Sequence, residues 1–205
     1  TKINNQQVGQ DADVTIFSFQ AVKNLPTGDS GMICFRDDDL DIKARKQAWL
    51  GISKDTYERF NKNSSSYNWK YDVEDVGFKY HGNSIMASIG LVQLNYLEQD
   101  NARRREIGQL YNNLLKDIDG VEIVKVFPKC ISSRHLFQIC VDNRDKVIQY
   151  LYDNEIYPGV HYCDNIQYSM YSYAEGTCPN AREKSETLLS LPLHLNISNE
   201  DVKHI

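Results

Sequence analysis

A helical pattern from Ser84 to about Ile118 constrains the fold more than any other feature of this sequence. Apolar residues recur there at spacings of three and four, which places them on one face of a helix. The polar run Gln99-Asp100-Asn101 interrupts the pattern and predicts a break. The sequence therefore predicts two long amphipathic helices, with apolar positions at Ile85, Ile89, Val92, Leu97, Ile107, Leu110, Tyr111, Leu114 and Ile118.

Short β-strand patterns precede these helices. Residues 14–19 and 31–35 are rich in β-branched and aromatic side chains, and turn formers at residues 24–30 separate them. The pattern predicts two strands joined by a tight loop. A helix is predicted over Asp37–Trp49, with Gly51 as its stop signal. The polar, serine-rich residues 53–72 predict a surface loop.

The region after Gly120 alternates short β runs with helical sequence. The β runs cover residues 121–126, 136–141 and 157–162, and a helical stretch lies near residues 145–153. This alternation is typical of a small α/β unit. Ser198, with Asp201 three residues later, predicts a helix that begins with a capping box shortly before Ile205. We expect both ends of the chain to be cut from a longer protein.

Charge and composition exclude several classes of function. A net charge of −5 leaves no broad cationic surface, so nucleic acid is not an expected partner. The run Arg103-Arg104-Arg105 is predicted to be a solvated helix face. The sequence has neither an apolar stretch long enough to cross a membrane nor a signal-peptide pattern. Its five cysteines form no Cys-x-x-Cys pair, so we predict a cytoplasmic protein without a metal site.

Lys23 stands out among the lysines because it follows an apolar strand and precedes a loop that contains proline and glycine. A lysine at a strand end can be partly desolvated, and its amine can then attack a carbonyl carbon to form a Schiff base. Lysines at loop edges are also common as solvated surface charges. The spacing leaves both interpretations of Lys23 open.

Several short segments are similar to the signatures of one enzyme family. The segment Ile16-Phe-Ser-Phe-Gln-Ala-Val-Lys23, with the loop that continues to Met32, resembles the lysine-bearing segment of the DegT/DnrJ/EryC1/StrS sugar aminotransferases. These are fold-type I pyridoxal-phosphate enzymes. Further segments match the family in the same order and extend the resemblance over nearly the whole chain: Gly77-Phe-Lys-Tyr-His-Gly-Asn83, Ile89-Gly-Leu-Val-Gln-Leu94, Ser133-Arg-His-Leu-Phe137, Gly159-Val-His-Tyr162 and Leu189-Ser-Leu-Pro192.

The resemblance implies that pyridoxal 5′-phosphate is the cofactor. Lys23 then holds it as a Schiff base and later moves protons during the transfer. Ser18 aligns with a hydroxyl that binds the cofactor phosphate, and Lys79 aligns with a residue that reaches this phosphate from the partner subunit. The simpler interpretations are that Ser18 is a strand-end hydroxyl bonded to backbone and that Lys79 is an exposed loop lysine.

The same resemblance implies a homodimer with a shared active site. The expected reaction moves an amino group from an amino-acid donor, glutamate, to a nucleotide-linked keto-sugar. Lys23 distinguishes the chain from related dehydratases, which carry histidine there. His135 and His161 match motif positions near the substrate pocket, and Gln20 occupies a position that is histidine in many relatives. Either histidine could instead be packed at a strand end.

The implied fold class is α/β, the C-terminal part of a fold-type I pyridoxal-phosphate-dependent transferase. Residues 1–98 are expected to end the large cofactor-binding domain and to include a connecting helix, and residues 99–205 to form the small C-terminal α/β domain. In the family, upstream sequence supplies a phosphate-binding hydroxyl, a group stacked on the cofactor ring and an aspartate at the pyridine nitrogen. Two other hypotheses are a catalytically silent fragment and a non-enzymatic α/β oligomerisation module.

Overall fold

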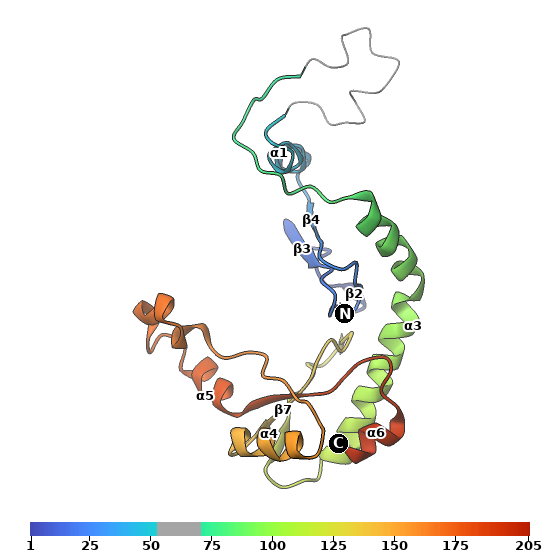
Figure 1. Ribbon diagram of the computed structural model, residues 1–205, viewed down its shortest axis with the longest axis vertical. Coiled ribbons are helices and arrows are strands. Elements are labelled where there is room, and N and C mark those ends of the chain that lie inside the picture. The colour runs from blue at the N-terminus through green and yellow to red at the C-terminus, as the bar shows by residue number, and fades with distance from the viewer. Residues whose placement is uncertain (53–70) are drawn as a thin grey trace. The chain divides into compact units, whose positions relative to one another are not determined.

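The computed structural model describes residues 1–52 and 71–205. The loop predicted at residues 53–72 lies, apart from its last two residues, outside the described residues. The chain divides into two compact units, one formed by Gln6–Tyr96 and the other by Thr1–Asn5 with Leu97–Ile205 (Figure 1). Each unit is described by itself. The predicted assignment of residues 1–98 and 99–205 to a large and a small domain stays a prediction.

The unit formed by Gln6–Tyr96 contains the expected pair of strands and the expected helix. Strand β2 covers Gln6–Gln7, β3 Val14–Ser18 and β4 Gly31–Phe35, and β3 pairs with β4 in antiparallel register. Helix α1 covers Asp38–Ala48, and the side chain of Asp37 caps it by accepting the Leu40 N–H at 3.0 Å. The prediction of two strands joined by a loop and followed by a helix is confirmed.

The β3–β4 hairpin carries apolar side chains that its own unit does not cover. Ile16, in the middle of β3, is 76% exposed. Other apolar residues of the two strands are also exposed: Val14, Phe17, Met32 and Ile33. Among the residues that the structure describes, every member of the buried hydrophobic cluster belongs to the other unit. The hairpin therefore presents an exposed apolar surface within its unit.

Helix α3 covers Ser84–Leu115 without interruption, so the predicted break near residues 99–101 is wrong. Polar residues there keep their backbone N–H groups, and no proline removes a hydrogen bond, so the helix continues. The buried residues of α3 begin only at Asn101, which explains why the hydrophobic pattern changes at this point. Arg104 is also buried, so the prediction of a solvated face is wrong for this arginine.

The second unit is a small α/β unit, as predicted. Its central sheet has the antiparallel order β5-β7-β8, and a shorter pair joins β1 to β6. Helices α4 and α5 contact β7, and two 3-10 turns lie between these helices in the sequence. The strands are β1 (Lys2–Ile3), β5 (Val121–Ile123), β6 (Cys130–Ile131), β7 (Phe137–Val141) and β8 (Leu188–Leu191), and the helices are α4 (Arg144–Asp153), η1 (Asn165–Gln167), η2 (Ser169–Ala174), α5 (Pro179–Thr187) and α6 (Asn199–His204).

The strand predicted at residues 157–162 is wrong, because this segment forms only an isolated bridge in which Gly159 pairs with Ser190 of β8. Gly159 and Ser190 exchange both backbone hydrogen bonds, at 2.9 and 2.7 Å. The next carbonyl that could extend the ladder, that of His161, accepts the side-chain amide of Gln138 instead. The third strand of the sheet is β8 instead. The capping box predicted at the start of α6 is confirmed, since Ser198 and Asp201 exchange hydrogen bonds at 2.9 and 3.0 Å.

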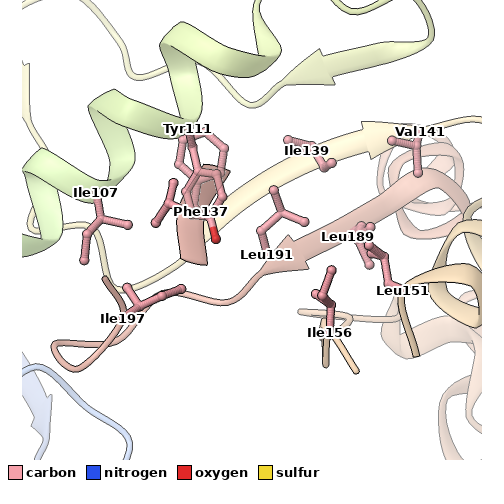
Figure 2. Close-up of a cluster of buried hydrophobic side chains, with 11 residues drawn as sticks. Ile107, Tyr111, Phe137, Ile139, Val141, Leu151, Ile156, Leu189, Leu191 and Ile197 are labelled. Carbon is pink, nitrogen blue, oxygen red and sulfur yellow. The ribbon is translucent and has the colours of Figure 1, made fainter. Parts of the chain in front are cut away.

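The hydrophobic core lies between the sheet β5-β7-β8 and helices α3, α4 and α6 (Figure 2). Phe137, Ile139 and Val141 alternate along β7 and so project from one face of the strand. Tyr111 of α3 stacks on Phe137 with ring centroids 5.0 Å apart, and its hydroxyl donates to the Pro192 carbonyl at 2.8 Å. None of the helices in the described ranges is long and apolar enough to span a bilayer.

Candidate active site

Lys23 lies in the loop that joins β3 to β4. Its N–H donates to the Gln20 carbonyl at 2.9 Å, which closes a tight turn over residues 20–23. The side chain of Gln20 supports the same turn, because its Oε1 accepts the Val22 N–H at 3.1 Å. Lys23 is half-buried. The local sequence thus fixes the backbone of Lys23, and the side chain keeps partial access to solvent.

The base of this loop is closed by hydrogen bonds around Thr27. The Thr27 N–H donates to the Phe19 carbonyl, and the Phe19 N–H donates to the Ser30 carbonyl, both at 2.8 Å. Thr27 is only 4% exposed, and its hydroxyl bonds to that of Ser30. Sequence reasoning missed Thr27, although its place in the cluster of turn formers was the available signal.

Ser18 is the last residue of β3 and is exposed. Its only hydrogen bond in the described part of the chain is a long one of 3.5 Å, which its oxygen accepts from the Gln20 N–H. The hydroxyl hydrogen of Ser18 is therefore available to an oxygen of a ligand. The structure has Ser18 at the end of β3 and Gln20 and Lys23 in the loop that follows, and their roles stay predictions.

Lys79 is held in the same unit by the C-terminal end of α1. A β-bridge pairs Lys79 with Trp49, and the flanking N–H groups of Phe78 and Tyr80 donate to backbone carbonyls of α1 at 2.7 and 3.0 Å. The Nζ of Lys79 lies 3.1 Å from the centroid of the Trp49 ring, a cation–π contact. His81 packs edge-on against the same ring, with centroids 4.2 Å apart.

Hydrogen bonds and ion pairs within the described residues do not connect Lys79 with Ser18 or Lys23. A groove of about 610 Å³ lies beside the β3–β4 loop, between this loop and the start of α3, and Thr27 and Leu94 are among its mostly apolar lining. Neither lysine lines the groove. Trp49 is a second residue that sequence reasoning missed, because a β-bridge between distant residues leaves no local pattern.

His161 lies in the second unit and is fixed from two sides. Its Nδ1 lies 2.9 Å from the hydroxyl of Ser190, and its carbonyl accepts the Nε2 of Gln138 at 2.7 Å. The ring packs on Gly159, where an added Cβ would lie only 2.6 Å from Cε1 of His161. Because Ser190 occupies Nδ1, the Nε2 nitrogen is the one left for a ligand. Ser190 was missed, although it lies within the Leu189–Pro192 segment.

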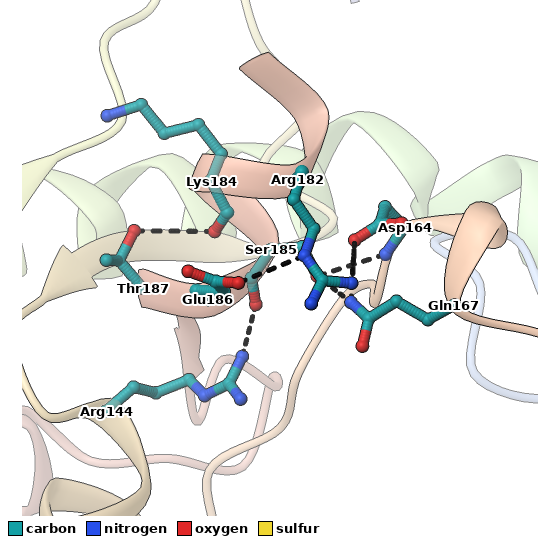
Figure 3. A network of polar contacts seen from close by, with 8 residues as sticks. All are labelled: Arg144, Asp164, Gln167, Arg182, Lys184, Ser185, Glu186 and Thr187. Carbon is teal, nitrogen blue, oxygen red and sulfur yellow. Dashed lines mark hydrogen bonds and ion pairs between the residues drawn. The ribbon is translucent and has the colours of Figure 1, made fainter. Parts of the chain in front are cut away.

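The chain that follows His161 is anchored by a polar network on α5 (Figure 3). The buried Asp164 accepts the side-chain amide of Gln167 at 2.6 Å and lies 3.8 Å from Arg182. The hydroxyl of Ser185 accepts the Asp164 N–H at 3.0 Å. These bonds hold the segment after the histidine against the helix.

His135 is half-buried and lies two residues before β7. The residue before it, Arg134, has a left-handed backbone with φ of 49°, which a non-glycine residue adopts at some cost. Burial lowers the pKa of Arg134 below its ordinary value. The structure describes His135 and His161 in one unit and Lys23 in the other, and the proposed substrate role of both histidines stays a prediction.

The mixed α/β fold of this chain is that of solved aminotransferases, two of which match it over almost its whole length. The aminotransferase TlmJ from Streptoalloteichus hindustanus matches with a TM-score of 0.86 and 34% identity over 98% of this chain and 52% of its own. The putative sugar aminotransferase Spr1654 from Streptococcus pneumoniae matches with a TM-score of 0.87 and 29% identity, over 99% and 53%.

The chain belongs to the DegT/DnrJ/EryC1/StrS aminotransferase family, whose model matches residues 1–205. It is 32% identical over its whole length to the dTDP-4-dehydro-2,3,6-trideoxy-D-glucose 4-aminotransferase of Saccharopolyspora spinosa. It is also 32% identical to the spore coat polysaccharide biosynthesis protein SpsC of Bacillus subtilis (strain 168). The chain spans about half the length of these curated relatives, 54% and 55% respectively.

Proposed function

We propose that this protein is a pyridoxal-phosphate-dependent aminotransferase that moves an amino group from glutamate to a keto-sugar linked to a nucleoside diphosphate. The observation that carries the proposal is the position of Lys23 in the β3–β4 loop of a chain that matches the family throughout. The relative from Saccharopolyspora spinosa is named for a nucleotide-linked keto-sugar of this kind.

The β3–β4 loop offers groups that suit two ends of pyridoxal 5′-phosphate. Ser18 has an exposed hydroxyl with its hydrogen available, and Lys23 has a half-buried amine on a fixed backbone. Lys23 would hold the cofactor through Nζ, and Ser18 would donate a hydrogen bond to a phosphate oxygen. When bound, the cofactor supplies a ring that withdraws electrons from the substrate carbon. The Nζ of Lys23 would move the proton to and from that carbon.

Lys79, His135, His161 and Gln20 complete the proposed site. Lys79 would reach the cofactor phosphate from the partner subunit, with its ammonium held over Trp49. An ammonium group has three donors, so the contact with the ring leaves donors for phosphate oxygens. His161 would present Nε2 to the sugar substrate because Ser190 holds Nδ1. Gln20 and His135 would lie at the edge of the substrate pocket.

The protein is proposed to be a homodimer with a shared active site. The exposed apolar side chains of β3 and β4 support this proposal, because surfaces of this kind are normally covered by further protein. Light scattering at high protein concentration should therefore report a dimer or a larger oligomer. A monomer under these conditions would contradict the proposal.

Residues 1–205 alone are proposed to be a catalytically silent fragment that does not retain the cofactor, and the alternative is a non-enzymatic α/β oligomerisation module that keeps the fold. The resemblance assigns the groups that stack on the ring and bind the pyridine nitrogen to upstream sequence, and it assigns neither role to a residue that the structure describes. Each missing hydrogen bond to a charged group costs about 1.5–3 kcal/mol, or roughly tenfold or more in affinity. Isolation of the 205-residue chain with bound cofactor would contradict this proposal.

Turnover by the protein expressed from its complete reading frame tests the function. Incubation with glutamate and a dTDP-linked 4-keto-sugar should yield 2-oxoglutarate and an amino-sugar nucleotide, detected by mass spectrometry. Lys23→Ala should abolish both products. Lys43→Ala, which removes an exposed lysine of α1, should change neither and serves as the matched control. Amino-sugar formation by the Lys23→Ala variant would refute the assignment.

A further inference from the structure

Arg134 is held in a cradle formed by the second unit. Its side chain crosses α3 at Gly108, where an added Cβ would lie 3.2 Å from Nε and 3.3 Å from Cδ of Arg134. Gly108 is buried in the interior of the helix, a position where glycine costs about 1 kcal/mol relative to alanine. The guanidinium carbon lies 5.5 Å from the centroid of the Phe137 ring. The absence of a side chain at position 108 therefore makes room for the arginine.

The charge of Arg134 has no counterion in the described part of the chain. Its guanidinium forms neither an ion pair nor a hydrogen bond with residues 1–52 or 71–205. Two arginines of α3 behave differently, because Arg103 donates to the Ile197 carbonyl at 2.9 Å and Arg104 donates to the Leu193 carbonyl at 3.3 Å. Those two arginines are structural. Arg134 is instead partly desolvated, rests on an aromatic ring and keeps its donors unused.

A partly buried cation without a partner costs stability, and a charge of this kind is a candidate binding group for an anionic ligand. The backbone around Arg134 supports this interpretation. Its left-handed φ of 49° is fixed by the Arg134 N–H, which donates to the Ser132 hydroxyl at 3.1 Å. Strained backbone of this kind concentrates at binding sites. The hydrogen of the Ser132 hydroxyl remains available to a second ligand oxygen.

We propose that Arg134 binds the diphosphate of the nucleotide-linked substrate, with Ser132 as a second donor. The planar guanidinium matches the geometry of two phosphate oxygens, and a diphosphate offers more charge than the carboxylate of an amino donor. The identity of the ligand rests on the proposed function, whereas the anion site itself does not depend on transamination. Arg134 lies next to His135, so the diphosphate would be bound beside a residue proposed for the substrate pocket.

Binding of dTDP and UDP, measured by calorimetry on the protein from its complete reading frame, tests the proposal. Arg134→Met keeps the aliphatic contact with Gly108 and removes the charge, and it should weaken dTDP or UDP binding by about tenfold or more. Arg134→Lys keeps the positive charge but loses the paired N–H donors of the guanidinium, so its affinity for dTDP or UDP should lie between those of the wild type and Arg134→Met. Arg45→Met, the same change at an exposed arginine of α1, should have no effect.

Two further readouts separate binding from a structural role. Arg134→Met should leave the melting temperature of the unliganded protein unchanged or raised, because it removes an unpaired charge. Gly108→Ala should weaken dTDP binding as well, because its Cβ displaces the guanidinium while the charge stays. Lys23→Ala should lose transamination and keep its affinity for dTDP. A failure of the proposed function can therefore be distinguished from a failure of the proposed anion site. The proposal would be overturned if the protein bound neither dTDP nor UDP, or if Arg134→Met bound them as tightly as the wild type. It would also be overturned if Arg134→Met weakened the binding of glutamate alone.

Discussion

The contact between Lys79 and Trp49 yields a prediction that can be worked out in detail. With Nζ 3.1 Å from the ring centroid and the side chain of Lys79 exposed, the interaction should contribute about 0.5–1 kcal/mol. Trp49→Leu and Lys79→Met each remove one partner and leave the backbone bridge in place. A double-mutant cycle on the free energy of unfolding in urea should return this coupling energy.

Trp49→Phe is the matched control, because it keeps an aromatic face and should preserve most of the coupling. Nuclear magnetic resonance gives an independent check, since the ring should shift the ε-protons of Lys79 upfield and Trp49→Leu should abolish this shift. Additivity of the two single changes within about 0.3 kcal/mol, together with an unshifted Lys79, would refute the reasoning. Lys79 would then be an ordinary exposed lysine.

Two other predictions concern stability. Leu189→Ala removes a fully buried side chain and should cost about 2–5 kcal/mol in urea denaturation, whereas Leu91→Ala, at a residue 68% exposed, should cost at most about 0.5 kcal/mol. Equal costs would contradict the location of the core. Hydrogen bonds from Ser198 lower the pKa of Asp201, so its contribution to stability is present above the unfolded pKa and is lost as pH falls through the folded one. The stability difference between wild type and Asp201→Asn should therefore shrink in acid titrations, and a constant difference would contradict the capping role.

Local features of the fold were predictable from the sequence because local chemistry determines them. The two strands, the turn between them, helix α1 and the capping box at Ser198 each follow from neighbouring residues. The predicted break in α3 failed because polar residues can remain within a helix when their backbone bonds continue. The third strand was misplaced because an apolar run does not specify strand pairing: only Gly159 of the predicted segment pairs with β8, and the His161 carbonyl bonds to the Gln138 side chain instead.

The sequence predicts the members of the candidate site that lie in a contiguous motif, and their roles stay predictions, whereas contacts between distant residues leave no local pattern. Lys23 and Ser18 lie in one segment, with Ser18 at the end of β3 and Lys23 in the loop that follows. The roles of Trp49 and Arg134 depend on partners 30 and 26 residues away, at Lys79 and Gly108. No periodicity reports such pairs, so sequence reasoning gave Arg134 no role within its motif.

Covalent trapping of the cofactor tests the central claim most directly. The protein from its complete reading frame should be incubated with pyridoxal 5′-phosphate, reduced with borohydride and digested for mass spectrometry. We predict that the peptide containing Lys23 carries the reduced cofactor. Lys23→Ala should abolish this modification and, before reduction, the near-visible absorbance of the Schiff base between lysine and cofactor. A modification distributed over surface lysines, or unchanged in Lys23→Ala, would contradict the assignment of Lys23.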